Sequence, residues 1–255
     1  NREEREDPGA FLTADCRGNL RRLHDEFSKK HNGLRLRMGT EPEMMWLKFD
    51  ENGKPKDGYS KPYCYHIDQF ESLRPVYMKV IEYARLMGLD MIQGDHEDAP
   101  GQLELNWTFD DVVRNADRLS TYRQICSQVA RENNLIACFM TKPFMGVSAS
   151  GCHTNISLWR GGEEGVNKLH NDKLPGMEGV FTYRTGGENT FMPDTDDPQL
   201  PGKVGLQCVG GIVKHLGALT AIGCSTVNSY RRLWDTGFCR SAQHQLALLC
   251  SLLTH

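Results

Sequence analysis

Residues 94–107 read GDHEDAPGQLELNW and carry two glutamates, Glu97 and Glu104, on either side of an Ala-Pro-Gly turn. The flanking residues have strand character, so the turn predicts a hairpin that brings the two carboxylates close together. Neighbouring carboxylates repel each other unless a cation lies between them, and oxygen ligands suit Mg²⁺ or Mn²⁺. The alternative is a hairpin with solvated rim charges, and this stretch taken alone favours that alternative.

A second carboxylate pair precedes the hairpin in the stretch TEPEMMWL, residues 40–47. Glu41 and Glu43 are two residues apart in a strand pattern, so both side chains face the same side. Apolar residues follow directly, and a buried carboxylate without a partner costs several kcal/mol or takes up a proton. The pair therefore either faces solvent or binds a metal.

The remaining pattern alternates helices with pairs of strands. Helices are predicted at residues 14–30, 68–88, 108–133 and 202–223, the third opening at Thr108 and the last buried. Strands are predicted at residues 33–49, with a break near Gly39–Thr40, in the hairpin, and at residues 135–144 and 151–159. Loops are predicted at residues 51–62 and 161–201. This order favours an α+β fold, an antiparallel β-sheet with flanking helices.

Composition limits the function classes. The 255 residues have a net charge of −3 and a pI near 6.3, which argues against general nucleic-acid binding. No apolar run approaches the ~18 residues that span a bilayer, and the charged N-terminal stretch lacks the apolar core of a signal peptide. Nine cysteines without a regular framework predict reduced thiols and a cytoplasmic protein.

Two further stretches carry chemistry. His153 lies in SGCHTNISLW after small residues that allow a ligand to approach the backbone, and Arg231 and Arg232 lie in STVNSYRRL after a polar strand or loop. Each is weak evidence alone. Four glutamates and a histidine for divalent metal, with an arginine for an anion, form a phosphoryl-transfer set, although no Walker A sequence is present. The residues predict a metal-dependent enzyme that acts on an anionic substrate.

Five motifs in order give a sharper reading. They are EPE (41–43), HEDAPGQLE (96–104), FMTKPF (139–144), SGCHTNISLW (150–159) and HLGALTA with STVNSYRRL (215–221 and 225–233). This order resembles the glutamine synthetase family over roughly residues 30–238. The resemblance implies the half-barrel catalytic domain of that family, which uses ATP to phosphorylate the γ-carboxyl of glutamate and then lets ammonia displace the phosphate.

The resemblance also implies roles by position. Glu43, Glu97 and Glu104 match the ligands of one metal, Glu41 and His153 match two of three ligands of a second, and the metals are Mg²⁺ or Mn²⁺. Arg232 matches the arginine that stabilises the reacting carboxylate and phosphate, and it is the catalytic residue. Substrate glutamate is expected at Ser148, Ala149, Gly151 and Arg232, and the ATP nucleotide at Phe109, Asn155 and Ser157.

Two departures from the family leave the acceptor amine open. Many members have Asn-Gly where this chain has Ser148-Ala149, and a second histidine where it has Asn155. Relatives in the family join glutamate to methylamine, putrescine or anilines instead of ammonia, and the sequence does not separate these branches.

The resemblance predicts three segments: a lead-in and linking helix at 1–29, the catalytic domain at 30–238, and a tail at 239–255 that matches no family motif. The resemblance implies that residues 1–255 do not include the family's N-terminal β-grasp domain or the third protein ligand of the second metal. The family forms dodecamers, so we expect a homo-oligomer with impaired assembly. A stable dodecamer in mass photometry would contradict that expectation.

Three hypotheses follow. The first is an ATP-dependent glutamate–amine ligase, with ammonia as the default amine. The second is a non-catalytic fragment that binds metal or nucleotide without turnover. The third, which sets the resemblance aside, is a metal-dependent hydrolase, and phosphate release without an amide product would favour it.

Overall fold

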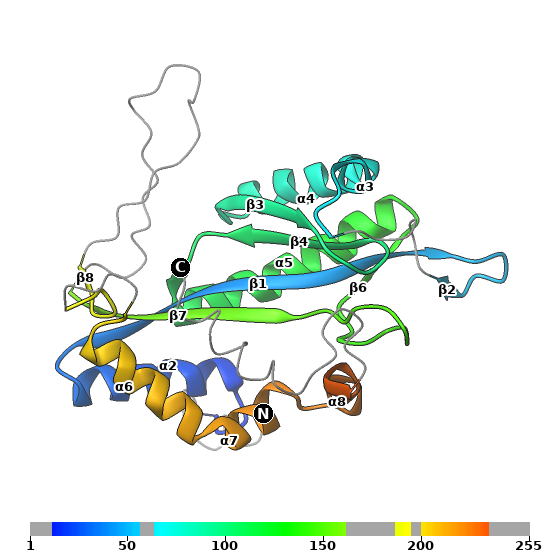
Figure 1. Cartoon of the computed structure of the whole chain (residues 1–255). Coiled ribbons are helices and arrows are strands. Elements are labelled where there is room, and N and C mark those ends of the chain that lie inside the picture. Colours follow the sequence, from blue (N-terminus) through cyan, green and yellow to red (C-terminus); the bar gives the residue numbers. More distant parts are fainter. Residues whose placement is uncertain (1–11, 57–63, 162–186, 195–199, 235–255) are drawn as a thin grey trace. The chain divides into compact units, whose positions relative to one another are not determined.

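The computed structural model describes residues 12–56, 64–161, 187–194 and 200–234 (Figure 1). The chain divides into two compact units. Unit 1 holds residues 1–38, 109–117 and 156–205, and unit 2 holds residues 39–108, 118–155 and 206–255.

The helices and strands alternate along the chain. The strands are β1 (Leu34–Phe49), β2 (Pro55–Lys56), β3 (Met91–His96), β4 (Gln102–Trp107), β5 (Asp110–Asp111), β6 (Ile136–Cys138), β7 (Cys152–Arg160) and β8 (Glu188–Asn189). The helices are α2 (Cys16–Lys30), α3 (Ile67–Ser72), α4 (Arg74–Leu86), α5 (Val112–Glu132), α6 (Lys203–Lys214), α7 (Leu216–Gly223) and α8 (Val227–Trp234).

Unit 2 is built on an antiparallel sheet. β4 pairs with β3 on one side and with β1 on the other, and β6 and the short β2 also pair with β1. The turn from β3 to β4 ends at Gly101, whose φ of 73° lies in the left-handed region that glycine adopts without strain. The predicted hairpin, the antiparallel sheet and the α+β fold class are therefore confirmed.

One face of this sheet is covered by helices α4 and α5. Met44 and Trp46 of β1 and Leu103 and Leu105 of β4 are fully buried in a single apolar cluster. The helices add buried side chains at helical spacing, at Val76, Tyr77, Val80 and Ala84 of α4 and at Tyr122, Ile125, Cys126, Val129 and Ala130 of α5. Fully burying a side chain of this size contributes roughly 1.5–3 kcal/mol, so this packing fixes which face each strand turns toward the helices.

Unit 1 contains α2, β5 and β8, together with the start of β1 and the end of β7. The Asp15 carboxylate caps α2 by accepting hydrogen bonds from the backbone N–H groups of Arg17 and Gly18, both at 3.0 Å. Buried His24 accepts a hydrogen bond at Nε2 from the backbone N–H of Leu36, at 2.9 Å. The helix predicted at residues 14–30 is confirmed.

Two predicted helices begin or divide differently from the prediction. The helix predicted at 68–88 is split at Leu73 into α3 and α4, because Pro75 fixes φ and lacks an N–H, which suits a helix start. The helix predicted to open at Thr108 begins at Val112 instead, after the short strand β5. Thr108 does not cap that helix, because β5 lies between them and the Thr108 hydroxyl donates instead to the Asp90 carboxylate, at 3.4 Å.

Three other predictions need correction. β1 has no break at Gly39–Thr40, since a glycine weakens a strand without ending it. The buried helix predicted at 202–223 is two helices, α6 and α7, bent by 72° and largely exposed in the part of the chain described. The apolar composition of residues 202–223 indicates a surface that can pack against a partner, but it does not identify the element that packs there. The stretch before Arg231 and Arg232, which was predicted as a polar strand or loop, forms the start of helix α8, and both arginines lie within that helix.

The loop predictions are tested in part. Within the loop predicted at 51–62, residues 55–56 form β2, and most of the loop predicted at 161–201 lies outside the described residues, as does the tail at 239–255. In the described ranges no single helix is long and apolar enough to cross a bilayer, although α6 and α7 pass that test as a bent pair. The cysteines in these ranges are all free.

Candidate active site

The strand register places carboxylates in a row across unit 2. Glu43 of β1 lies directly opposite Glu104 of β4, and Glu104 lies opposite Asp95 of β3. Because side chains alternate along a strand and Met44 and Leu103 face the helices, Glu43 and Glu104 both face away from the helix-covered core. The packing of apolar neighbours therefore aims the carboxylates at the face of the sheet opposite α4 and α5.

Glu43 is held from three directions. Its Oε2 accepts hydrogen bonds from Gln102 Nε2 at 3.1 Å and from the backbone N–H of Gly151 at 2.8 Å. Its Oε1 lies 3.0 Å from His153 Nε2. A Cβ at position 151 would lie 2.8 Å from both Glu43 Oε1 and His153 Nε2, so only glycine allows this approach.

The other predicted ligands have amide partners or lie close to the same cluster. Asn155 Nδ2 donates to Glu41 Oε1 at 2.7 Å, and Asn106 Nδ2 donates to Glu104 Oε1 at 2.8 Å. Glu97 leaves β3 at the hairpin turn, and its Oε2 accepts a long hydrogen bond from the thiol of Cys64 at 3.9 Å.

The carboxylates of the cluster are buried close together, which makes their charged forms unfavourable. Burial, followed by the charges of Glu43 and Glu104, raises the pKa of Glu97 to about 8. Burial also raises the pKa of Glu104 to about 7, against the hydrogen bond from Asn106 that lowers it. The hydrogen bond to Glu43 raises the pKa of His153. Protons or a cation are needed to offset these charges.

A divalent cation needs several oxygen or nitrogen donors that converge on one point. Within the described ranges no three His, Cys, Asp or Glu side chains converge closely enough to coordinate an ion as they stand. Glu41, Glu43 and Glu104 each accept a hydrogen bond from a side-chain amide, which engages one of the two oxygens of each carboxylate. The donor set is nevertheless rich in carboxylate oxygen with one imidazole, and such a set suits Mg²⁺ or Mn²⁺.

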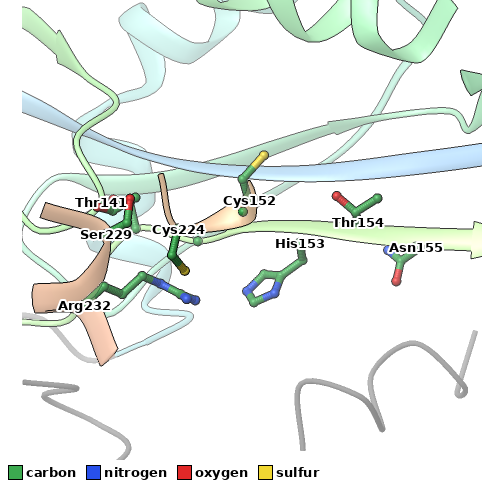
Figure 2. Close-up of a pocket in the computed structure, with 11 residues that line it drawn as sticks. Thr141, Cys152, His153, Thr154, Asn155, Cys224, Ser229 and Arg232 are labelled. Atoms are coloured by element: carbon green, nitrogen blue, oxygen red, sulfur yellow. The ribbon is translucent and has the colours of Figure 1, made fainter. Parts of the chain in front are cut away.

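A cavity of about 250 Å³ lies beside this cluster, also within unit 2. Its lining comes from the start of β7 and from the region around α7 and α8, and it includes Gly151, His153, Asn155 and Arg232. Figure 2 shows the Arg232 side chain extending from α8 toward His153. The cavity therefore has a cationic guanidinium on one side and a histidine of the carboxylate cluster on the other.

The predicted glutamate-binding residues divide into two groups. Gly151 and Arg232 line the cavity, whereas Ser148 and Ala149 are not among its lining residues. The hydroxyl of Ser148 donates to the Asp98 carboxylate, and the carbonyl of Ala149 accepts from Gln102 Nε2 at 3.0 Å. These two residues link the loop before β7 to the β3–β4 turn.

The predicted nucleotide-binding residues are divided between the two units, and Asn155 and Ser157 both lie on strand β7. Asn155 contacts Glu41 in unit 2, whereas Phe109 and Ser157 belong to unit 1, where both contact Trp159. The rings of Phe109 and Trp159 stack with centroids 6.0 Å apart, and Trp159 Nε1 donates to Ser157 Oγ at 2.8 Å.

Gln102 and Asn106 are site residues that the sequence reasoning missed. Gln102 is 1% exposed, donates to Glu43, and accepts at Oε1 from the backbone N–H of Ala99 at 2.9 Å. Both amides lie two residues from Glu104 and so share its face of β4. The alternation Gln-Leu-Glu-Leu-Asn was the available signal, because polar residues on one face of a buried strand need partners.

Comparison with known proteins identifies relatives of the chain. The model of the glutamine synthetase catalytic domain matches residues 13–187 and 180–243. A glutamine synthetase of Rhizobium leguminosarum bv. phaseoli is 35% identical over 237 residues, which is 88% of this chain and 48% of that protein. A glutamate–methylamine ligase of Methyloversatilis universalis is 32% identical over 200 residues, which is 76% of this chain and 39% of that protein.

A solved structure of a GmaS/ADP complex matches the fold with a TM-score of 0.67 and 30% identity, covering 85% of this chain and 44% of that one. The chain thus spans about half the length, or less, of the relatives that it matches. Because the family model covers most of its residues, the chain belongs to the glutamine synthetase family and matches the catalytic domain of that family.

Proposed function

We propose that this chain provides the carboxylate cluster of an ATP-dependent ligase that joins the γ-carboxyl of glutamate to ammonia. The observation that carries the proposal is the pairing of Glu43 with Glu104 across adjacent strands, with His153 Nε2 3.0 Å from Glu43. Membership of the glutamine synthetase family and the ADP complex of a relative support the assignment of reaction and nucleotide.

Each charged residue has a role in this proposal. Glu43, Glu97 and Glu104 would hold one Mg²⁺ or Mn²⁺, and Glu41 and His153 would contribute to a second. When bound, the cations offset the negative charge of the nucleotide phosphates and of the group being transferred. The guanidinium of Arg232, which lines the adjacent cavity, would bind the glutamate γ-carboxylate and the phosphate that it receives.

Residues around the cluster would position it. Gln102 and the N–H of Gly151 fix one oxygen of Glu43, and Asn106 fixes one oxygen of Glu104. Placement in the cytoplasm is predicted from the cysteine usage, and association into a homo-oligomer from the family resemblance.

The test is a reaction with Mg²⁺, ATP, glutamate and ammonia in which phosphate and glutamine are both measured. We expect equal amounts of the two products, and loss of both in Glu104→Gln and Arg232→Ala proteins. Absence of phosphate release with ammonia and with a panel of amines would refute the catalytic proposal. Metal binding without turnover would support the non-catalytic alternative.

A second candidate is ligation of glutamate to another amine, such as methylamine, putrescine or an aniline. Asn155 donates to Glu41 at 2.7 Å at a position where many family members have a second histidine, and one of the relatives is a glutamate–methylamine ligase. Rates with ammonia and methylamine at equal concentration separate the two candidates. A higher rate with methylamine, with its amide as the product, would favour the second.

A further inference from the structure

Asn228, in the first turn of α8, is bonded to the loop that carries Thr141 and Lys142, and Thr141 lines the cavity. Its Oδ1 accepts hydrogen bonds from Thr141 Oγ1 at 2.9 Å and from the backbone N–H of Lys142 at 2.8 Å. Its Nδ2 donates to the carbonyl of Lys142 at 2.7 Å. The side-chain amide thus pairs with both backbone polar groups of Lys142, as a neighbouring strand would.

The loop that receives Asn228 is itself well anchored. Lys142 is 2% exposed, and its ammonium group donates to the carbonyl of Val147. The carbonyl of Thr141 accepts from the backbone N–H of Ser150 at 2.8 Å, and Ser150 Oγ accepts from Gln102 Nε2 at 3.2 Å. Asn228 therefore connects α8 to the same network that holds Glu43.

Arg232 follows Asn228 by four residues, so the two side chains lie on the same face of α8. α8 has eight residues, and a helix of that length is marginal in water without tertiary contacts. The guanidinium of Arg232 lines the cavity. The position of Arg232 then depends on whatever holds the first turn of its helix.

We propose that Asn228 is a positioning residue that fixes α8 so that Arg232 reaches the anionic group in the cavity. The part that concerns Arg232 rests on the function proposed above, whereas the anchoring of α8 rests on the three hydrogen bonds alone. Asn228 does not itself contact the substrate in this account.

The anchoring is tested by hydrogen–deuterium exchange of the α8 amides in the whole chain. Asn228→Ala removes all three hydrogen bonds, and we expect exchange in α8 to rise by about tenfold, equivalent to ~1.4 kcal/mol. Asn228→Asp keeps the two acceptor contacts but sets a carboxylate oxygen against the carbonyl of Lys142, so exchange in α8 should rise in this variant as well. Asn133→Ala is the matched control, because the side-chain amide of Asn133 donates to the carbonyl of Val129 at the end of α5, at 2.8 Å, and makes no contact with α8 in the described part of the chain.

The action through Arg232 is tested by a double-mutant cycle with inorganic phosphate as the probe, titrated by calorimetry. In the chain that retains Asn228, Arg232→Ala should weaken phosphate binding by about tenfold, or ~1.4 kcal/mol. In the Asn228→Ala background the same change should have an effect below about twofold, because Arg232 has already lost its position.

Four outcomes separate the steps. Reduced protection of α8 together with a non-additive cycle supports the proposal. Unchanged exchange in α8 of Asn228→Ala overturns it. Equal effects of Arg232→Ala in both backgrounds overturn the link to Arg232. If Arg232→Ala leaves phosphate binding unchanged in the chain that retains Asn228, Arg232 does not bind the anion, which contradicts both its role in the proposed function and its link to Asn228. The hydrogen–deuterium exchange result would still decide whether Asn228 anchors α8.

Discussion

At the scale of single residues, Gly151 leaves the space in which Glu43 and His153 meet. A methyl group at this position would lie 2.8 Å from Glu43 Oε1 and from His153 Nε2, which is too close for either to keep its place. Glycine is therefore required here for the close approach of side chains and not for an unusual backbone conformation.

We expect Gly151→Ala to weaken Mn²⁺ binding by about tenfold, or ~1.4 kcal/mol, because Glu43 and His153 must move apart. Calorimetric titration measures the change. Gly210→Ala in α6 is the control, since its Cβ would meet nothing within 4 Å. Equal affinity of Gly151→Ala and the unmodified chain would contradict the account.

Glu97 gives a prediction for pH. Its pKa is raised from 4.5 to about 8 in the fold, so the metal-free folded protein keeps a proton that the unfolded chain has released. Unfolding then releases a proton between these values, and the free energy of unfolding falls as pH rises through that window.

Urea unfolding at several pH values across the window measures this dependence in metal-free protein. Glu97→Gln removes the titrating group, so its free energy of unfolding should fall less steeply with rising pH. The same slope for both proteins would show that Glu97 does not carry a raised pKa.

At the scale of elements, alternation along β4 places apolar side chains on one face of the strand and polar side chains on the other. Leu103, Leu105 and Trp107 face α4 and α5, while Gln102, Glu104 and Asn106 face the candidate site. A shift of the strand by one residue would exchange the two faces, so the packing of Leu103 and Leu105 also sets the position of Glu104.

Leu105→Ala should lower the free energy of unfolding by about 2–5 kcal/mol, because Leu105 is fully buried and a cavity would remain. Chemical denaturation measures the loss. Ile92→Ala on the neighbouring strand β3 is the comparison, since Ile92 is 55% exposed and its loss should cost less than about 0.5 kcal/mol. Similar losses for both variants would contradict the assigned faces.

At the scale of the whole molecule, the fold class and the hairpin were predictable because strand alternation and turn residues are local signals. Glu43 and Glu104 were predicted as members of one metal site from the family motifs, and the register places them opposite each other. Gln102 was missed because its partners lie on β1 and in the loop before β7, which are distant in sequence, whereas Asn106 contacts Glu104 on its own strand and could have been found from the alternation.

The errors also have a physical cause. The split at Leu73 depends on whether Pro75 starts a helix or bends one, and both are compatible with the apolar periodicity of residues 68–88. The exposed, bent pair of α6 and α7 was predicted as one buried helix because composition reports apolar surface and not its partner.

The central claim is that the paired carboxylates of β1 and β4 bind a divalent cation. Calorimetric titration of the chain with Mn²⁺ tests it most directly, alongside Glu43→Gln and Glu104→Gln, with exposed Glu82→Gln in α4 as a control for the loss of one carboxylate. The account predicts saturable binding that Glu82→Gln retains and that the other two variants weaken by about tenfold or more, or ~1.4 kcal/mol. Absence of Mn²⁺ binding, or equal binding by all four proteins, would contradict it.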